Sequence, residues 1–189
     1  MIEKLNIISF KFINHFAGIN LVFDNFVIVI AKYLFTVFIL WLVYLWFRKK
    51  KRCKNIALYS GYSAILGILV NFLITSFYYH PRPFMLHLGK LLIPHPPETS
   101  FPSDHTTFML SIAFMLIYFR ETRISGIVLS LFGLIGGLAR VFCGIHFPLD
   151  IIGSLIVSLV VSFVVYSLKD KLKTLNQSVI KIYFKIFNK

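Results

Sequence analysis

The chain has 189 residues, of which 58% are hydrophobic, 17% aromatic and 14% charged, and its formal net charge is +13. The apolar residues fall in long runs, which is typical of a helical membrane protein and excludes an ordinary soluble domain. Because the cations gather in a few short segments, they indicate anionic membrane lipid as their partner and exclude a nucleic-acid-binding protein.

The first segment, residues 1–20, mixes apolar and polar residues. Glu3, Lys4, Asn6, Lys11 and His15 interrupt the apolar run, so we do not expect a removable secretory signal. The pattern predicts an amphipathic helix that lies on the membrane interface. A sixth, half-inserted span is the alternative.

Five later runs are long enough, or nearly so, to cross the roughly 30 Å hydrocarbon core of a bilayer. They are Phe26–Phe47, Ile56–Tyr79, Ser103–Phe119, Ile124–Cys143 and Pro148–Leu168. We therefore expect an all-α polytopic membrane bundle of about five transmembrane helices, in which residues 1–189 form a single domain. The tail after Lys169 alternates apolar and basic residues and predicts a second surface helix.

The distribution of cations predicts the orientation of the bundle. Fourteen of the 20 lysines and arginines lie in residues 48–54, 120–123 and 169–189. The positive-inside rule places these three segments in the cytoplasm. Residues 80–102 and 144–147 then lie on the outer side of the cytoplasmic (inner) membrane, and all six histidines of the chain fall on that side as well. Cys53 and Cys143 fall on opposite sides, so they are not expected to pair within the chain.

Several ionisable residues lie at the outer connections, where function is the default explanation for a charge at membrane depth. Each also has a purely structural explanation. Arg82 could be an interfacial anchor, and Arg140 could stabilise the carboxyl end of its helix. Asp150 could be the first-turn carboxylate of a helix that begins at Pro148.

The remaining histidines do not predict a metal site. The chain has no HxxxH pattern and no Cys/His pair at a recognised ligand spacing, so we expect neither a metal nor another cofactor. His87 and His95 are expected to be ordinary loop residues at the interface.

Three segments, taken in order, form a motif. They are Arg82-Pro83, Pro102-Ser103-Asp104-His105, and Arg140-x5-His146-x3-Asp150. They resemble the K-x6-R-P, P-S-G-H and S-R-x5-H-x3-D motifs of the type 2 phosphatidic-acid phosphatase superfamily, and the third segment, which keeps both spacings, is the most specific. The resemblance covers about residues 56–168. "HPRPF", "FPSDHT" and the short chain are most similar to the bacitracin-resistance branch, whose members are undecaprenyl-diphosphate phosphatases.

The chain departs from the family pattern at three positions. Thr75 stands where the family has a lysine, and Lys90 could replace that lysine only if its loop folds back. Asp104 stands in place of a glycine and adds negative charge near an anionic substrate. Ala139 replaces the serine before Arg140. These departures affect the number of phosphate contacts rather than the class of reaction.

The resemblance implies a role for each matched residue. His146 would be the nucleophile that forms a phosphohistidine, Asp150 would bind its other ring nitrogen, and His105 would protonate the leaving group and then activate water. The phosphate would be bound by Arg82, Ser103 and Arg140. Further candidates for contact with it are Asp104, Lys90 and Thr75.

By this resemblance we expect a metal-independent phosphatase that hydrolyses undecaprenyl diphosphate, recycles the cell-wall lipid carrier and confers bacitracin resistance. Its partners would be the polyprenyl diphosphate and membrane lipids, and the sequence does not predict an oligomeric state. A broad lipid phosphatase, acting on phosphatidic acid or phosphatidylglycerophosphate, is the nearest alternative. A non-catalytic lipid-phosphate binder or transporter is a second, although inverted repeats and interrupted helices are not evident.

Overall fold

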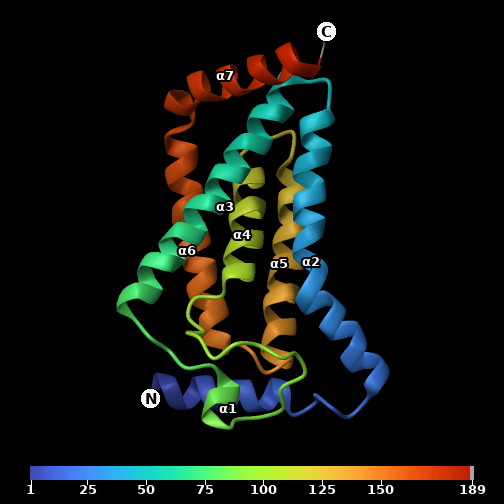
Figure 1. The fold of residues 1–189 in the computed structure, drawn as a ribbon, viewed down its shortest axis with the longest axis vertical. Coiled ribbons are helices and arrows are strands. Elements are labelled where there is room, and N and C mark those ends of the chain that lie inside the picture. The colour runs from blue at the N-terminus through green and yellow to red at the C-terminus, as the bar shows by residue number, and fades with distance from the viewer. Residues whose placement is uncertain (188–189) are drawn as a thin grey trace.

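The computed structural model describes residues 1–187, which are helical and contain no strand (Figure 1). The helices are α1 (Ile2–Asn14), α2 (Leu21–Phe47), α3 (Lys51–Phe77), the short 3₁₀ helix η1 (Pro83–Leu86), α4 (Asp104–Ile117), α5 (Arg123–Phe142), α6 (Pro148–Ser167) and α7 (Lys169–Phe187). The predicted all-α bundle is confirmed.

Among the described residues, four helices are long and apolar enough to cross a membrane: α2, α3, α5 and α6. The fifth, α4, has 14 residues and therefore extends only about 21 Å. The sequence predicts a full span over Ser103–Phe119, whereas the helix ends at Ile117. It packs against α3, α5 and α6, so protein rather than lipid covers most of it. Its amino-terminal end lies recessed within the bundle (Figure 1).

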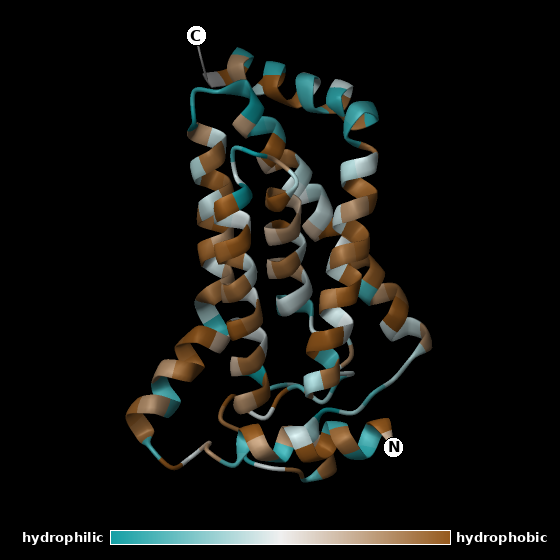
Figure 2. Cartoon of the chain, turned by 180° about the vertical axis from the view of Figure 1, so that it is seen from behind, coloured by the Kyte–Doolittle hydropathy of each residue, from teal (hydrophilic) through white to brown (hydrophobic). Residues whose placement is uncertain are grey.

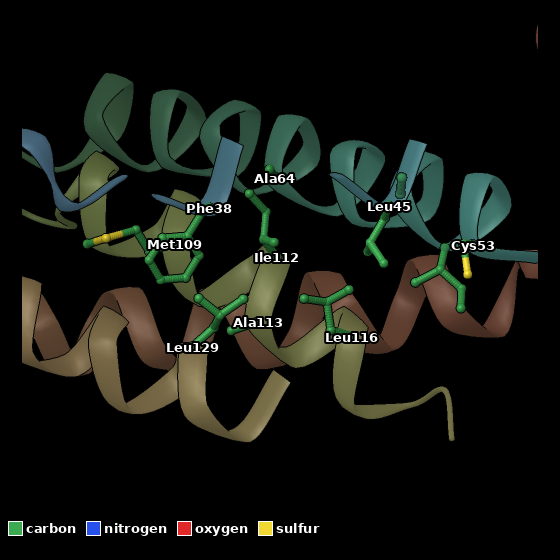
Figure 3. Close-up of a cluster of buried hydrophobic side chains, with 11 residues drawn as sticks. Phe38, Leu45, Cys53, Ala64, Met109, Ile112, Ala113, Leu116 and Leu129 are labelled. Atoms are coloured by element: carbon green, nitrogen blue, oxygen red, sulfur yellow. The ribbon is translucent and has the colours of Figure 1, made fainter. Parts of the chain in front are cut away.

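The core of the bundle surrounds α4 (Figure 3). Ile112 and Leu116 of this helix are fully buried, and Phe38 of α2 and Ala64 of α3 pack in the same cluster. Within a bilayer, close packing holds helices together, because lipid tails are as apolar as the side chains. Small residues such as Ala64 and Ala113 allow the helix backbones to approach one another.

Polar segments mark both ends of the bundle (Figure 2). Helix α1 crosses one end, beside the loop before α4 and the α5–α6 connection, and α7 crosses the other, beside the α2–α3 connection (Figure 1); we call these the α1 end and the α7 end. Both surface helices are confirmed. Cys53 and Cys143 are free and buried, as expected.

Helix α1 is amphipathic, and its inner face holds the loops at its end of the bundle. It exposes Leu5 and Phe12, whereas the buried Asn14 amide donates hydrogen bonds to the carbonyls of Lys90 (2.9 Å) and Phe142 (2.7 Å). Nearby, Oδ1 of Asn6 accepts a hydrogen bond from the backbone N–H of Leu149, in the first turn of α6, at 3.0 Å. Helix α1 therefore holds two regions that are far apart in the sequence: the loop before α4 and the α5–α6 connection.

Candidate active site

A cavity of about 240 Å³ opens at the α1 end of the bundle, beside the start of α4. Its walls come from four parts of the chain: the end of α3, the loop before α4, the first turn of α4 and the region around the α5–α6 connection. Six of the predicted site residues line it, namely Thr75, Arg82, Asp104, His105, Arg140 and His146. The fold thus brings most of the motif together.

His146 lies in the tight connection between α5 and α6. Gly144 begins this turn with a φ of +81°, where an added Cβ would collide with the carbonyl oxygen of Lys90. Pro148 then starts α6, and Oδ2 of Asp150 accepts the backbone N–H of Phe147 at 2.7 Å. Asp150 therefore is a first-turn carboxylate, as the structural explanation required, and this role aims it at His146.

The ring of His146 lies between a carboxylate and a guanidinium. Its Nδ1 is 3.2 Å from Oδ2 of Asp150, and its Nε2 is 3.2 Å from Nη1 of Arg82. Because an arginine can only donate, Nε2 must accept, and the ring proton is assigned to Nδ1, facing Asp150. The lone pair of Nε2 therefore faces the cavity wall formed by Arg82.

Burial keeps this imidazole neutral. His146 is 2% exposed, and burial lowers the pKa of its ring to about 3, although the hydrogen bond to Asp150 acts in the opposite direction. The positive charges of Arg140 and Arg82 lower the pKa further. A neutral ring with an available lone pair is the form that a nucleophile needs.

The two arginines are buried at the cavity with spare donor capacity. Arg82 and Arg140 are each 5% exposed. Arg140 donates to the carbonyl of Ala31 at 3.1 Å, and Arg82 donates to that of Ile145 at 2.9 Å. The Nε–H of each has no partner. A buried donor without an acceptor is costly, so two of them beside one cavity indicate an anionic ligand such as a phosphate.

The start of α4 presents His105 to the cavity, with its half-buried ring edge-on to Phe35 at a centroid distance of 5.3 Å. Asp104 also lines it and accepts a bond from the Asn71 amide at 2.8 Å. Ser103, by contrast, is fully buried and is not among the lining residues. Its hydroxyl accepts a bond from Thr106 at 3.0 Å.

The structure does not bring Lys90 to the cavity. Its ammonium group donates to the carbonyl of Ala17 at 2.8 Å and lines a separate hollow beside α1. The loop therefore does not fold back in the way that would let Lys90 replace the family lysine. Thr75 does line the cavity, and its hydroxyl donates to the carbonyl of Phe72 at 2.9 Å.

Two loop residues were not expected at the site. His95, predicted to be an ordinary interfacial residue, lines the cavity, and burial lowers the pKa of its ring. Glu98 lines it as well and forms an ion pair with Arg82 at 3.2 Å. The prolines on either side predict a rigid loop but not the direction in which it folds.

A third unexpected residue lies behind the site. Nδ1 of His80 is 3.6 Å from Oδ1 of Asp150, an oxygen that is buried without a hydrogen-bond partner. The same nitrogen is 2.8 Å from the Ser100 hydroxyl, and the other ring nitrogen is 3.7 Å from Glu3 of α1. Asp150 thus lies between two imidazoles.

Known proteins share this architecture. The chain is 37% identical to undecaprenyl-diphosphatase BcrC of Bacillus subtilis over 98% of its length and 95% of that relative. It is 25% identical to the bacitracin transport permease protein BcrC of Bacillus licheniformis, over 97% and 90% of the two chains. The crystal structure of Aquifex aeolicus LpxE matches 86% of this chain and 95% of its own, with a TM-score of 0.71 and 26% identity.

The family model that matches is that of the PAP2 superfamily, and the match runs over residues 56–173. This range contains most of α3, all of α4 to α6, and every residue that lines the cavity. With four helices that are long and apolar enough to cross a membrane among its described residues, the chain is an integral membrane protein. It belongs to the PAP2 superfamily.

Proposed function

We propose that the chain hydrolyses undecaprenyl diphosphate to undecaprenyl phosphate and inorganic phosphate. The observation that carries the chemistry is the neutral, buried His146, whose Nδ1 faces Asp150 and whose Nε2 faces Arg82. The substrate is inferred from the relative named as an undecaprenyl-diphosphatase, which is similar along 98% of the chain.

In the first step, Nε2 of His146 attacks the terminal phosphorus of the diphosphate. A P–N bond forms, and the bond from that phosphorus to the bridging oxygen breaks, which releases undecaprenyl phosphate. His105 donates a proton to the leaving oxygen. The ring of His146 becomes positively charged, and Asp150 stabilises that charge through the Nδ1 hydrogen bond. Arg82 and Arg140 bind the phosphoryl oxygens.

In the second step, water replaces the imidazole. His105, now unprotonated, accepts a proton from water, whose oxygen attacks the phosphorus. The P–N bond breaks, inorganic phosphate leaves, and His146 returns to its neutral form. The residues of the cavity supply the charges and protons that this sequence requires, so the proposal includes no metal.

The proposed location of the reaction is the outer face of the cytoplasmic membrane. The predicted cytoplasmic segments lie at the α7 end (Figure 1), whereas the cavity is lined by the loops of the α1 end. The lipid tail would remain in the bilayer while the diphosphate enters the recessed site. Phosphatidic acid and phosphatidylglycerophosphate are the alternative substrates, because the superfamily also includes broad lipid phosphatases. One relative is named as a permease, so a transport role without catalysis is a second alternative.

The test is phosphate release by the purified protein from a panel of prenyl diphosphates, phosphatidic acid and phosphatidylglycerophosphate, with and without EDTA. We expect the highest kcat/KM for undecaprenyl diphosphate, unchanged by chelation. Faster hydrolysis of a glycerophospholipid would show that this lipid, and not undecaprenyl diphosphate, is the preferred substrate. No hydrolysis of any of these lipids would favour the transport role.

A further inference from the structure

A second hollow lies at the α7 end of the bundle, far from the candidate active site. It encloses about 430 Å³ between the end of α2, the start of α3 and the α4–α5 connection. None of its lining residues is a histidine, so it lacks the groups on which the proposed chemistry depends.

The rim of this hollow is basic. Arg48, Lys50 and Arg120 line it, and none of the three has a carboxylate partner among residues 1–187. The one acidic lining residue, Glu121, is already paired with Arg52 at 3.0 Å. The rim therefore keeps an excess of positive charge that its own side chains do not neutralise.

The hollow also has apolar lining residues and one unused donor. Trp41 and Leu45 of α2 and Ile124 of α5 line it; Leu45 is buried, whereas Ile124 is 80% exposed toward the surroundings of the bundle. The indole Nε1 of Trp41 is buried without a hydrogen-bond partner. Arg48 directly follows the last residue of α2, seven residues after Trp41 and about 10 Å further along the helix axis.

The basic rim, the unused donor and the apolar residues match the three parts of a phospholipid: its phosphate, its ester groups and its acyl chains. Basic pockets between transmembrane helices bind anionic head groups, and an indole at this depth commonly donates to a polar group at the membrane interface. The phosphate would lie among Arg48, Lys50 and Arg120. The Trp41 N–H would donate to an ester oxygen, and the acyl chains would lie along Ile124.

We propose that this hollow is a binding site for one anionic phospholipid of the leaflet at the α7 end. It is separate from the substrate site and goes beyond the proposed catalytic activity. The lipid would bridge the α2–α3 and α4–α5 connections, which the Arg52–Glu121 ion pair already joins on one side. Bound in this way, it would hold the α7 ends of four helices in register.

The test uses the full-length protein and native mass spectrometry, with phosphatidylglycerol, phosphatidylcholine and inorganic phosphate as separate probes. The variant is Lys50→Glu with Arg120→Gln, because neither side chain makes a hydrogen bond or ion pair in the described residues. A second variant, Trp41→Phe, removes the unused donor and keeps an aromatic ring at that position. The matched control is Lys171→Glu with Lys173→Gln, which makes the same charge change on α7 at the same end.

We expect wild-type protein to retain phosphatidylglycerol over phosphatidylcholine by about 5-fold or more, and the rim variant to lose that preference while the control keeps it. Trp41→Phe should lower retention by about 2- to 5-fold. Equal losses in the rim variant and the control would overturn the site in favour of diffuse attraction to the whole basic surface. Displacement of the lipid by inorganic phosphate would show an anion site instead.

Phosphatase turnover in phosphatidylcholine nanodiscs is the control for folding. It verifies that each variant is folded, and it does so independently of lipid retention.

Discussion

Nδ1 of His146 lies 3.2 Å from Oδ2 of Asp150, and the same carboxylate oxygen accepts the backbone N–H of Phe147 at 2.7 Å. One side chain therefore both starts α6 and orients the proposed nucleophile. The two roles reinforce each other, because the bond to the backbone of Phe147 holds the carboxylate in the position from which it contacts the imidazole. The geometry directs Nε2 of His146 toward Arg82, at 3.2 Å from its Nη1, and so toward the group that would bind the phosphate.

The first prediction follows from this pair. His146→Gln should lower kcat by about 100-fold or more, since a glutamine amide cannot accept the phosphoryl group in place of the imidazole Nε2. Asp150→Asn should also impair turnover severely, because it removes the charge that stabilises the phosphorylated ring. Wild-type protein quenched in base should carry a phosphohistidine that His146→Gln lacks. If His146→Gln keeps more than about a tenth of the wild-type kcat, another residue is the nucleophile.

The second prediction concerns stability and pH. In the unfolded chain a histidine titrates near pH 6.5, whereas the pKa of folded His146 is about 3. Between these values the unfolded chain binds more protons, so the free energy of unfolding should fall as the pH falls from about 7 toward 3. The Tm of the detergent-solubilised protein should therefore drop less on acidification in His146→Gln than in the wild type. Parallel curves would show that His146 does not remain neutral in the fold.

The sequence predicted those parts of the site that depend on local spacing. Asp150 lies one helical turn after His146, and Pro148 marks the start of that helix, so their contact follows from the chain itself. The approach of Arg82 and His105 was inferred from motif order alone. No local pattern required it, because it depends on how three helices pack.

What the sequence could not predict lies in the long loop. Glu98 and His95 reach the cavity, and His80 reaches the back of Asp150, only because the loop between α3 and α4 folds over the α1 end. Helix α4 also ends earlier than its apolar run suggests. There the Thr122 hydroxyl donates to the carbonyl of Leu116 at 2.8 Å, which closes the chain into the next turn.

The third prediction concerns Glu98, whose carboxylate pairs with Arg82 at 3.2 Å. Substrate phosphate must compete with this carboxylate for the guanidinium. Glu98→Gln should lower KM by about 2- to 5-fold, with a smaller effect on kcat, because a partly exposed ion pair contributes little energy. Asp170→Asn, which removes a carboxylate on α7, is the control and should leave KM unchanged. A raised KM in Glu98→Gln would mean that Glu98 assists substrate binding.

The fourth prediction concerns Asp104, which lines the cavity and accepts a bond from Asn71. The family pattern has glycine at this position, so Asp104→Gly should keep activity within about 3-fold of wild type, with weaker repulsion of the anionic substrate offsetting the lost hydrogen bond. Asp104→Asn retains a partner for Asn71 and separates the two effects. Abolished turnover in a folded Asp104→Gly protein would assign this carboxylate a direct role.

The last prediction tests the proposed orientation of the protein. The cations at the α7 end predict that this end faces the cytoplasm, and the cavity at the α1 end would then face outward. Leu91 and Lys173 are exposed at opposite ends of the bundle, while Cys53 and Cys143 are buried and so give little background labelling. In intact cells, a membrane-impermeant maleimide should label Leu91→Cys and spare Lys173→Cys until the membrane is opened. Labelling of Lys173→Cys alone would invert the topology, and the diphosphate would then have to be cleaved on the cytoplasmic side.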